Sequence, residues 1–170
     1  MKQWMRFILS CVWSPSLLLQ IVLVLILGRV NEDRLNTLVY AAGVMWWILL
    51  LFGWLPIIVF KRKGGVPKGK SFVHTATLVD TGLYSVIRHP QYTAGILWSI
   101  TWVFFFQKWL IAIIGAAVII LLYLDILMAD KYEIEKFGDS CKRYMQEVPG
   151  VIFLLGFIRL LKRRRKRISQ

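Results

Sequence analysis

Residues 35–60 read LNTLVYAAGVMWWILLLFGWLPIIVF and contain no charged side chain. A helix rises about 1.5 Å per residue, so this stretch is long enough to cross the roughly 30 Å hydrocarbon core of a bilayer. The chain is 58% hydrophobic and only 18% charged, which is more apolar surface than a soluble domain of this length buries. The stretch therefore predicts a membrane-spanning helix and an all-α membrane protein.

Three further apolar stretches predict three more membrane-spanning helices. Residues 7–28 and 91–107 hold no charged side chain, and residues 109–128 hold only Asp125. The last two stretches are separated by Lys108 alone, so we expect a tight helical hairpin there. Pro15 lies near the start of the first stretch and should kink it or end a short first segment. The sequence thus predicts a polytopic protein of about four transmembrane helices, formed as one domain over residues 1–170.

The charge of the chain predicts its orientation. It carries 22 Lys and Arg against 9 Asp and Glu, a formal net charge of +13. The basic residues gather at the N-terminus, in the loop 61–89 and in the tail 159–170, and cytoplasmic loops of membrane proteins are rich in Lys and Arg. We therefore expect both termini and the loop to be cytoplasmic, with the tail on anionic lipids. No nucleic-acid motif accompanies the charge, and Cys11 and Cys141 match no metal-binding spacing, so neither nucleic acid nor metal is expected.

The chain after the fourth apolar stretch is predicted to lie at the membrane surface, in cytoplasmic and interfacial helices over residues 129–158. Apolar side chains recur there every three or four residues, at Phe137, Cys141, Tyr144, Met145 and Val148. This spacing is typical of one face of an amphipathic helix. Residues 148–158 are too few to span a bilayer and are expected to lie at the interface.

One polar segment, residues 80–92, reads DTGLYSVIRHPQY. Proline suits the first position of a helix, and the residue before a proline avoids helical angles. Arg88 and His89 are thus predicted to lie just ahead of a helix that begins at Pro90. The N–H groups at that helix end and the guanidinium of Arg88 favour an anionic group. This group could belong to a bound ligand or to a lipid headgroup.

The pattern Gly-x-Tyr-x-x-x-Arg-His-Pro-x-Tyr of residues 82–92 resembles the isoprenylcysteine carboxyl methyltransferase and phospholipid methyltransferase family. Phe137-Gly138, Tyr144 and Val148-Pro149 are similar to the closing pattern of that family. The likeness covers roughly residues 70–150. Members of the family are membrane enzymes that move a methyl group from S-adenosylmethionine to a lipid-like or prenylated acceptor.

The resemblance implies which residues line the pocket for S-adenosylmethionine. It implies Thr77, Leu78, Val79, Tyr84, His89, Pro90, Gln91 and Tyr92. We add Arg88 to this cofactor site as the cation just before the helix start. In the family a histidine usually precedes the Thr-Leu-Val-like stretch, whereas this chain has Ala76 at that place and His74 two residues earlier.

A larger departure concerns the acceptor. Prenylcysteine-type members place an arginine twelve residues before the Phe of Phe-Gly and a glutamate eight before it, where this chain has Asp125 and Ala129. Asp125 would repel a carboxylate, so we expect another lipid-like acceptor, carrying an amine, hydroxyl or thiol. Asp125 is our candidate catalytic residue, because a carboxylate can pair with the charge of such a group or take its proton. Alternatively, it pairs with a basic residue of a neighbouring helix.

Two more acidic residues are candidates for the cofactor site. Asp130 and Glu133 lie three residues apart on one helix face and could offset the positive charge of the sulfonium. The alternative is that both are ordinary solvated residues.

The predicted function is S-adenosylmethionine-dependent methyl transfer to a membrane-embedded acceptor, at a cytoplasmic site. Sterol and steroid reductases use a similar Arg-His-Pro-x-Tyr segment to bind NADPH, but there Gly-Glu usually follows, whereas Thr93-Ala94-Gly95 follows here. An NADPH-dependent reductase is therefore the second hypothesis. A non-catalytic relative that keeps the pocket is the third.

Overall fold

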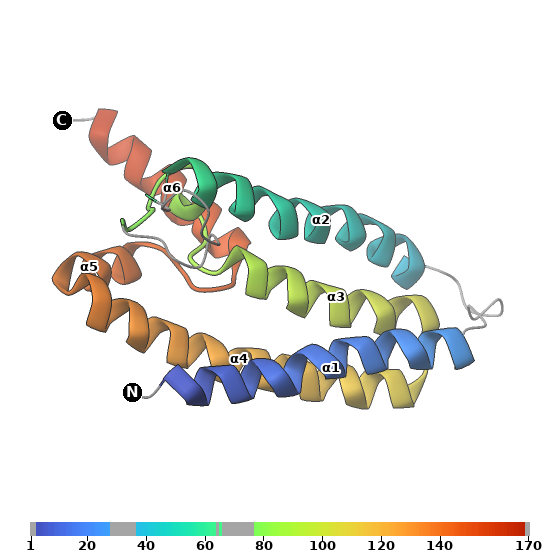
Figure 1. Cartoon of the computed structure of the whole chain (residues 1–170). Coiled ribbons are helices and arrows are strands. Elements are labelled where there is room, and N and C mark those ends of the chain that lie inside the picture. Colours follow the sequence, from blue (N-terminus) through green and yellow to red (C-terminus); the bar gives the residue numbers. More distant parts are fainter. Residues whose placement is uncertain (1–2, 28–36, 64, 66–76, 169–170) are drawn as a thin grey trace. The chain divides into compact units, whose positions relative to one another are not determined.

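The computed structural model describes residues 3–27, 37–63, 65 and 77–168 (Figure 1). Its elements in chain order are α1 (Gln3–Leu27), α2 (Thr37–Lys63), the 3-10 helix η1 (Gly82–Ser85), α3 (Pro90–Phe106), α4 (Trp109–Phe137), α5 (Asp139–Glu147) and α6 (Phe153–Ile168). These ranges contain no strand, which confirms the all-α prediction.

Two of the described helices, α2 and α4, are long and apolar enough to cross a membrane, and Ser14–Leu27 of α1 is a shorter apolar stretch. Only 12% of the most apolar part of α2 and 33% of that of α4 are buried within the protein. A core helix of a soluble domain would bury far more of this surface. The number of spans and the side of each terminus remain predictions.

Several helix boundaries differ from those predicted. Helix α1 is continuous through Pro15, so no separate first segment forms in the described range. Helix α4 continues past residue 128 and ends at Phe137, and α6 includes most of the tail that we predicted for 159–170. Gly138 sets the turn between α4 and α5 with a φ of 61°, a left-handed conformation that favours glycine. The charged residues that follow Asp125, up to Lys136, therefore belong to α4 and do not begin a new helix.

The described chain divides into two compact units, and α2, α3 and α4 contribute residues to both. The first unit comprises Met1–Leu51 and Ala94–Lys131. In it the Ser99 hydroxyl donates to Gln20 Oε1 at 3.3 Å, and both residues are fully buried. A Cβ added to Gly115 of α4 would lie 2.9 Å from Gln20 Nε2. Helices α1, α3 and α4 thus meet at one small polar layer, as helices in membranes do at small residues.

Aromatic side chains fill much of the rest of the first unit. The Trp46 ring of α2 lies 5.5 Å from that of Trp98 and 5.7 Å from that of Trp102, both on α3. Phe106 and Ile111, on either side of the α3–α4 turn, form a buried cluster with Val24 of α1. Because ring contacts of this kind stabilise a packed interior, the first unit is held mainly by side chains.

The second unit comprises Phe52–Thr93 and Tyr132–Gln170. Phe52 of α2 packs on Phe153 of α6, with ring centroids 5.5 Å apart. The turn at Gly138 leads from α4 into α5 (Figure 1). Cys141, Tyr144 and Val148 are buried, which confirms the amphipathic helix that we predicted here.

Candidate functional site

The polar motif 80–92 leads into helix α3, as predicted. The helix starts at Pro90, and His89 and Arg88 lie just before it. The backbone N–H of Arg88 donates to the Pro149 carbonyl and that of His89 to the Gly150 carbonyl, each at 3.0 Å. The Arg-His-Pro and Val-Pro motifs, sixty residues apart in the chain, are therefore joined by two backbone hydrogen bonds.

A second connection joins the tyrosines of the same two motifs. The Tyr144 hydroxyl of α5 donates to the Tyr84 carbonyl of η1 at 2.7 Å. Gly82 starts η1 with a φ of 66°, so the first glycine of the motif, like Gly138, adopts a left-handed conformation. Gly82 and Gly138, the two glycines of the family motifs, thus lie at the backbone turns that precede Tyr84 and Tyr144.

Both phenols are held in the neutral form. Burial raises the pKa of Tyr84 well above its ordinary range, and the neighbouring Tyr144 and the Glu133 carboxylate add to the effect. Burial likewise raises the pKa of Tyr144, with Glu133 again contributing, while the nearby Arg88 guanidinium acts in the opposite direction. At physiological pH both side chains are therefore neutral hydrogen-bonding groups in a region that also holds a carboxylate and a guanidinium.

A small cavity of about 40 Å³ lies at these tyrosines. Its lining comprises Thr77, Leu78, Val79, Tyr84, Arg88, Glu133, Phe137 and Tyr144. Six of these eight are residues that we predicted for the cofactor. The cavity has room for a few water molecules and is too small for a nucleoside.

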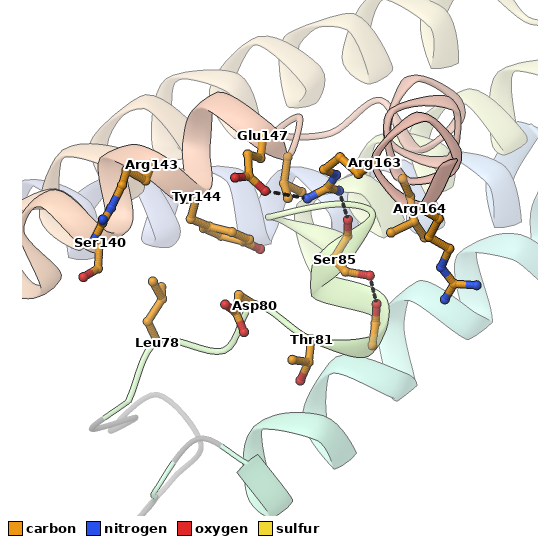
Figure 2. Close-up of a pocket in the computed structure, with 13 residues that line it drawn as sticks. Leu78, Asp80, Thr81, Ser85, Ser140, Arg143, Tyr144, Glu147, Arg163 and Arg164 are labelled. Atoms are coloured by element: carbon orange, nitrogen blue, oxygen red, sulfur yellow. Dashed lines mark hydrogen bonds and ion pairs between the residues drawn. The ribbon is translucent and has the colours of Figure 1, made fainter. Parts of the chain in front are cut away.

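A larger cavity of about 740 Å³ shares Leu78 and Tyr144 with the small one. Figure 2 shows its walls: the segment from Leu78 to Ser85 on one side and side chains of α5 and α6 on the other. Its size falls within the range of about 300–1,000 Å³ that is typical of small-molecule sites. It is thus large enough for a nucleotide-sized ligand.

The lining of the large cavity carries charges of both signs. Asp80 and Glu147 are the acids, and Arg143, Arg163 and Arg164 are the bases. Hydroxyl groups come from Thr81, Ser85 and Ser140, and apolar surface comes from Leu78, Val148 and Leu160. A ligand that combines an ammonium, a carboxylate and sugar hydroxyls would find complementary groups here.

Arg163 joins three parts of this wall. Its Nη1 donates to Glu147 Oε2 at 2.9 Å, and its Nη2 donates to the Ser85 carbonyl at 2.7 Å. Figure 2 shows the guanidinium between these two partners. Helix α6 is thereby tied both to α5 and to the loop that carries the motif.

Four predicted cofactor residues, His89, Pro90, Gln91 and Tyr92, line neither of the two cavities. His89 is buried, and its ring meets that of Tyr92 edge to face, with centroids 5.6 Å apart. Gly150 also packs here, because a Cβ on it would lie 3.5 Å from Arg88 Nη2. In this part of the second unit the motif therefore fixes the start of α3 against the chain at Pro149–Gly150.

The acidic residues predicted on α4 fall into different units. Glu133 lies in the second unit and lines the small cavity, whereas Asp125 and Asp130 lie in the first unit and line neither cavity. Asp125 is buried, on the same helix face as Leu122 and Ala129. The candidate catalytic carboxylate thus faces the protein interior. His74 and Ala76 lie outside the described residues.

The sequence did not point to six residues of the large cavity, namely Ser140, Arg143, Glu147, Leu160, Arg163 and Arg164. Their positions on α5 and α6 were predicted to be a membrane-surface helix and a lipid-binding tail. One signal was present: Arg143 and Glu147 lie four residues apart, so they share a face of α5 that neighbours the apolar one.

The comparisons with known proteins agree with the motif. Residues 69–135 match the family model described as the isoprenylcysteine carboxyl methyltransferase (ICMT) family. "Protein-S-isoprenylcysteine O-methyltransferase B" of Arabidopsis thaliana is 28% identical over 122 residues. The alignment covers 64% of this chain and 61% of the plant protein. No solved structure matches. The family resemblance recognised in the motif is confirmed, and with the apolar helices α2 and α4 it indicates a membrane protein.

Proposed function

We propose that this chain, whose residues 69–135 match the isoprenylcysteine carboxyl methyltransferase family, is an S-adenosylmethionine-dependent methyltransferase with a membrane-embedded or lipid-like acceptor. One observation carries the proposal. Six residues predicted for the cofactor, four of them implied by the resemblance, surround one small cavity, which shares Leu78 and Tyr144 with a cavity of about 740 Å³. A motif that served only to bind lipid headgroups would not require a nucleotide-sized hollow beside it.

The residues of the second unit fit this cofactor. Arg143 and Arg164 would hold its carboxylate, while Asp80 and Glu147 would hold its ammonium group and its ribose hydroxyls. Arg163 would keep Glu147 in place. Glu133, at the small cavity, would offset the positive sulfonium. When bound, S-adenosylmethionine supplies an electrophilic methyl group, and its sulfur keeps the electron pair of the broken bond.

The residues of this chain contribute alignment and the removal of a proton. The backbone hydrogen bonds at Arg88 and His89 and the Tyr144–Tyr84 bond fix the walls of the site before the ligand arrives. Such preorganisation contributes much of the rate of a displacement reaction. Asp125, buried on α4, would accept the proton that a hydroxyl, thiol or amine nucleophile loses when the methyl group joins it.

The acceptor that we propose differs from the substrate in the name of the plant relative. That relative is named for an isoprenylcysteine, and the resemblance implies an arginine for the carboxylate where this chain has Asp125. A carboxylate facing a carboxylate is repelled, most strongly in a medium of low dielectric constant. A lipid-like acceptor with an amine, hydroxyl or thiol is therefore favoured.

We further propose that the chain crosses the membrane about four times, with the cofactor cavity and both termini on the cytoplasmic side and the basic tail on anionic lipids. The cations at Lys61, Arg62 and Lys63, which end α2, and those of α6 support this orientation. An acceptor could then reach α4 laterally from the lipid, while a soluble cofactor enters from the cytoplasm.

Two measurements test the proposal. In calorimetric titration of the purified protein in detergent, S-adenosylhomocysteine should bind and NADPH should not. Expression of the protein should add a methyl group to at least one membrane lipid, detected by mass spectrometry of lipid extracts. Binding of NADPH alone would support a reductase, which the methyltransferase comparisons do not favour. Binding of neither ligand, with no methylated lipid, would support a non-catalytic relative.

A further inference from the structure

Helix α6 belongs to the second unit and has two opposite faces. The face that packs on the rest of this unit is not the apolar one. Gly156 and Arg163, two helical turns apart, lie toward η1 and α5. A Cβ on Gly156 would lie 1.8 Å from the Val86 carbonyl oxygen, so the backbones are in direct contact there. Leu160, on the same side, lines the large cavity.

The other face of α6 is apolar and exposed. The exposed fractions are 64% for Leu154, 54% for Phe157, 51% for Ile158 and 47% for Leu161. An amphipathic helix on a soluble domain turns such a face toward the protein. An apolar face directed outward instead marks a surface for a partner.

The charge of α6 identifies the partner. Seven cations, Arg159, Lys162, Arg163, Arg164, Arg165, Lys166 and Arg167, occur within residues 153–170, which contain no acid. Lys162 and Arg165 are exposed beside the apolar face, where their stems can lie on lipid while their charges reach phosphate groups. A second copy of α6 would be repelled by the same charges, whereas an anionic membrane surface complements them.

We propose that α6 is an interfacial helix through which an anionic membrane surface controls the proposed cofactor site. The apolar face inserts into the bilayer, the flanking cations bind anionic headgroups, and the inner face then keeps Arg163 on Ser85 and Glu147. Away from an anionic surface, α6 dissociates from η1 and α5 more often. The large cavity then loses the wall formed by Leu160, Arg163 and Arg164. This inference rests on the proposed function, since its readout is cofactor binding.

The proposed coupling between membrane binding by α6 and cofactor binding in the large cavity is reciprocal. If the anionic surface strengthens cofactor binding, the cofactor must strengthen the binding of α6 to the surface by the same factor. Screening by salt should weaken the electrostatic part of the effect.

The test compares S-adenosylhomocysteine binding by calorimetry in two kinds of nanodisc, one of phosphatidylcholine and one that also contains phosphatidylserine. We expect binding about tenfold tighter in the anionic discs, a typical size for such coupling. Phe157→Asn with Leu161→Asn should remove this difference and leave the affinity in phosphatidylcholine unchanged, because both side chains are exposed. Lys162→Gln should reduce the difference. Lys142→Gln, an equal loss of charge on the exposed surface of α5, should not.

Three results would overturn the inference and leave the proposed function standing. The first is equal affinity in both kinds of disc. The second is the same gain from soluble glycerophosphoserine, which would indicate a headgroup site without a bilayer. The third is an α6-mediated dimer, detected by native mass spectrometry, whose dissociation removes the gain. Absence of binding in every disc would instead contradict the proposed function itself.

Discussion

The contacts inside the first unit differ in kind from those inside the second. In the first, Trp46, Trp98, Trp102 and the Gln20–Ser99 pair make contact through side chains. In the second, segments sixty residues apart are joined through backbone groups of residues 84, 88 and 89. Side-chain contacts can adjust to a change, whereas a backbone contact fixes the position of both segments. The packing of the first unit can therefore adjust to a change, whereas the second unit holds the walls of its cavities in place.

The largest expected effect is at Asp125, the proposed proton acceptor in the first unit. Asp125→Asn, in the first unit, should lower methyl transfer by about 10²–10⁴-fold, the usual contribution of a general base. S-adenosylhomocysteine affinity should stay within about twofold of wild type, since Asp125 lines neither cavity of the second unit. Turnover is followed with labelled cofactor and a membrane lipid extract. Glu135→Gln, an exposed change of equal charge on the same helix, is the control. Full turnover in Asp125→Asn would assign this residue a structural role.

A glycine-to-alanine substitution in each unit tests the difference between side-chain contacts in the first unit and backbone contacts in the second. In the second unit, Gly156→Ala would put a Cβ against the Val86 carbonyl oxygen, which cannot move without η1. We expect a loss of about 1–3 kcal/mol in stability, as for overpacked cores, and about tenfold weaker S-adenosylhomocysteine binding. In the first unit, Gly115→Ala would meet the end of the Gln20 side chain at 2.9 Å, which can rotate, so a smaller loss is expected.

Gly53→Ala controls for helix propensity, because nothing lies within 4 Å of its added Cβ. It should be neutral or stabilising by up to about 1 kcal/mol. Thermal unfolding in detergent and calorimetry provide the two readouts. An equal loss of stability at Gly115 and Gly156 would contradict the distinction between side-chain and backbone contacts.

The contrast also explains how much could be predicted from the sequence. Long uncharged stretches predicted α2, α3 and α4, because hydrophobicity acts locally and is visible in the composition. Pro90 fixed the start of α3 for an equally local reason. The wall formed by Arg163 and Glu147 could not be predicted, since it depends on a helix turning its apolar face outward. A basic tail with the same composition could serve as a lipid anchor without forming part of a cavity.

A smaller effect is expected at the hydrogen bond between the motif tyrosines. Tyr144→Phe removes the donor to the Tyr84 carbonyl, a bond of 2.7 Å between buried groups. Leaving the carbonyl without this donor should cost about 1–3 kcal/mol, and S-adenosylhomocysteine binding should weaken accordingly. Thermal unfolding and calorimetry measure both effects. Ser99→Ala removes the hydrogen bond to Gln20 in the first unit and should leave cofactor affinity unchanged. Tighter or unchanged binding in Tyr144→Phe would mean that the bond does not shape the site.

The smallest effect is the alkaline loss of stability that the same residue should cause. Burial raises the pKa of Tyr144 in the folded protein above its ordinary value of 10.0, so its neutral form is favoured by folding. The corresponding stability is fully present below pH 10.0 and decreases as the pH rises past that value, because only the unfolded chain then releases the proton. Melting temperatures measured from about pH 8 to about pH 11 should therefore fall less steeply for Tyr144→Phe than for wild type. Parallel curves for wild type and Tyr144→Phe would mean that this phenol is as accessible to water as one on the surface, which would contradict its burial beside the cavities.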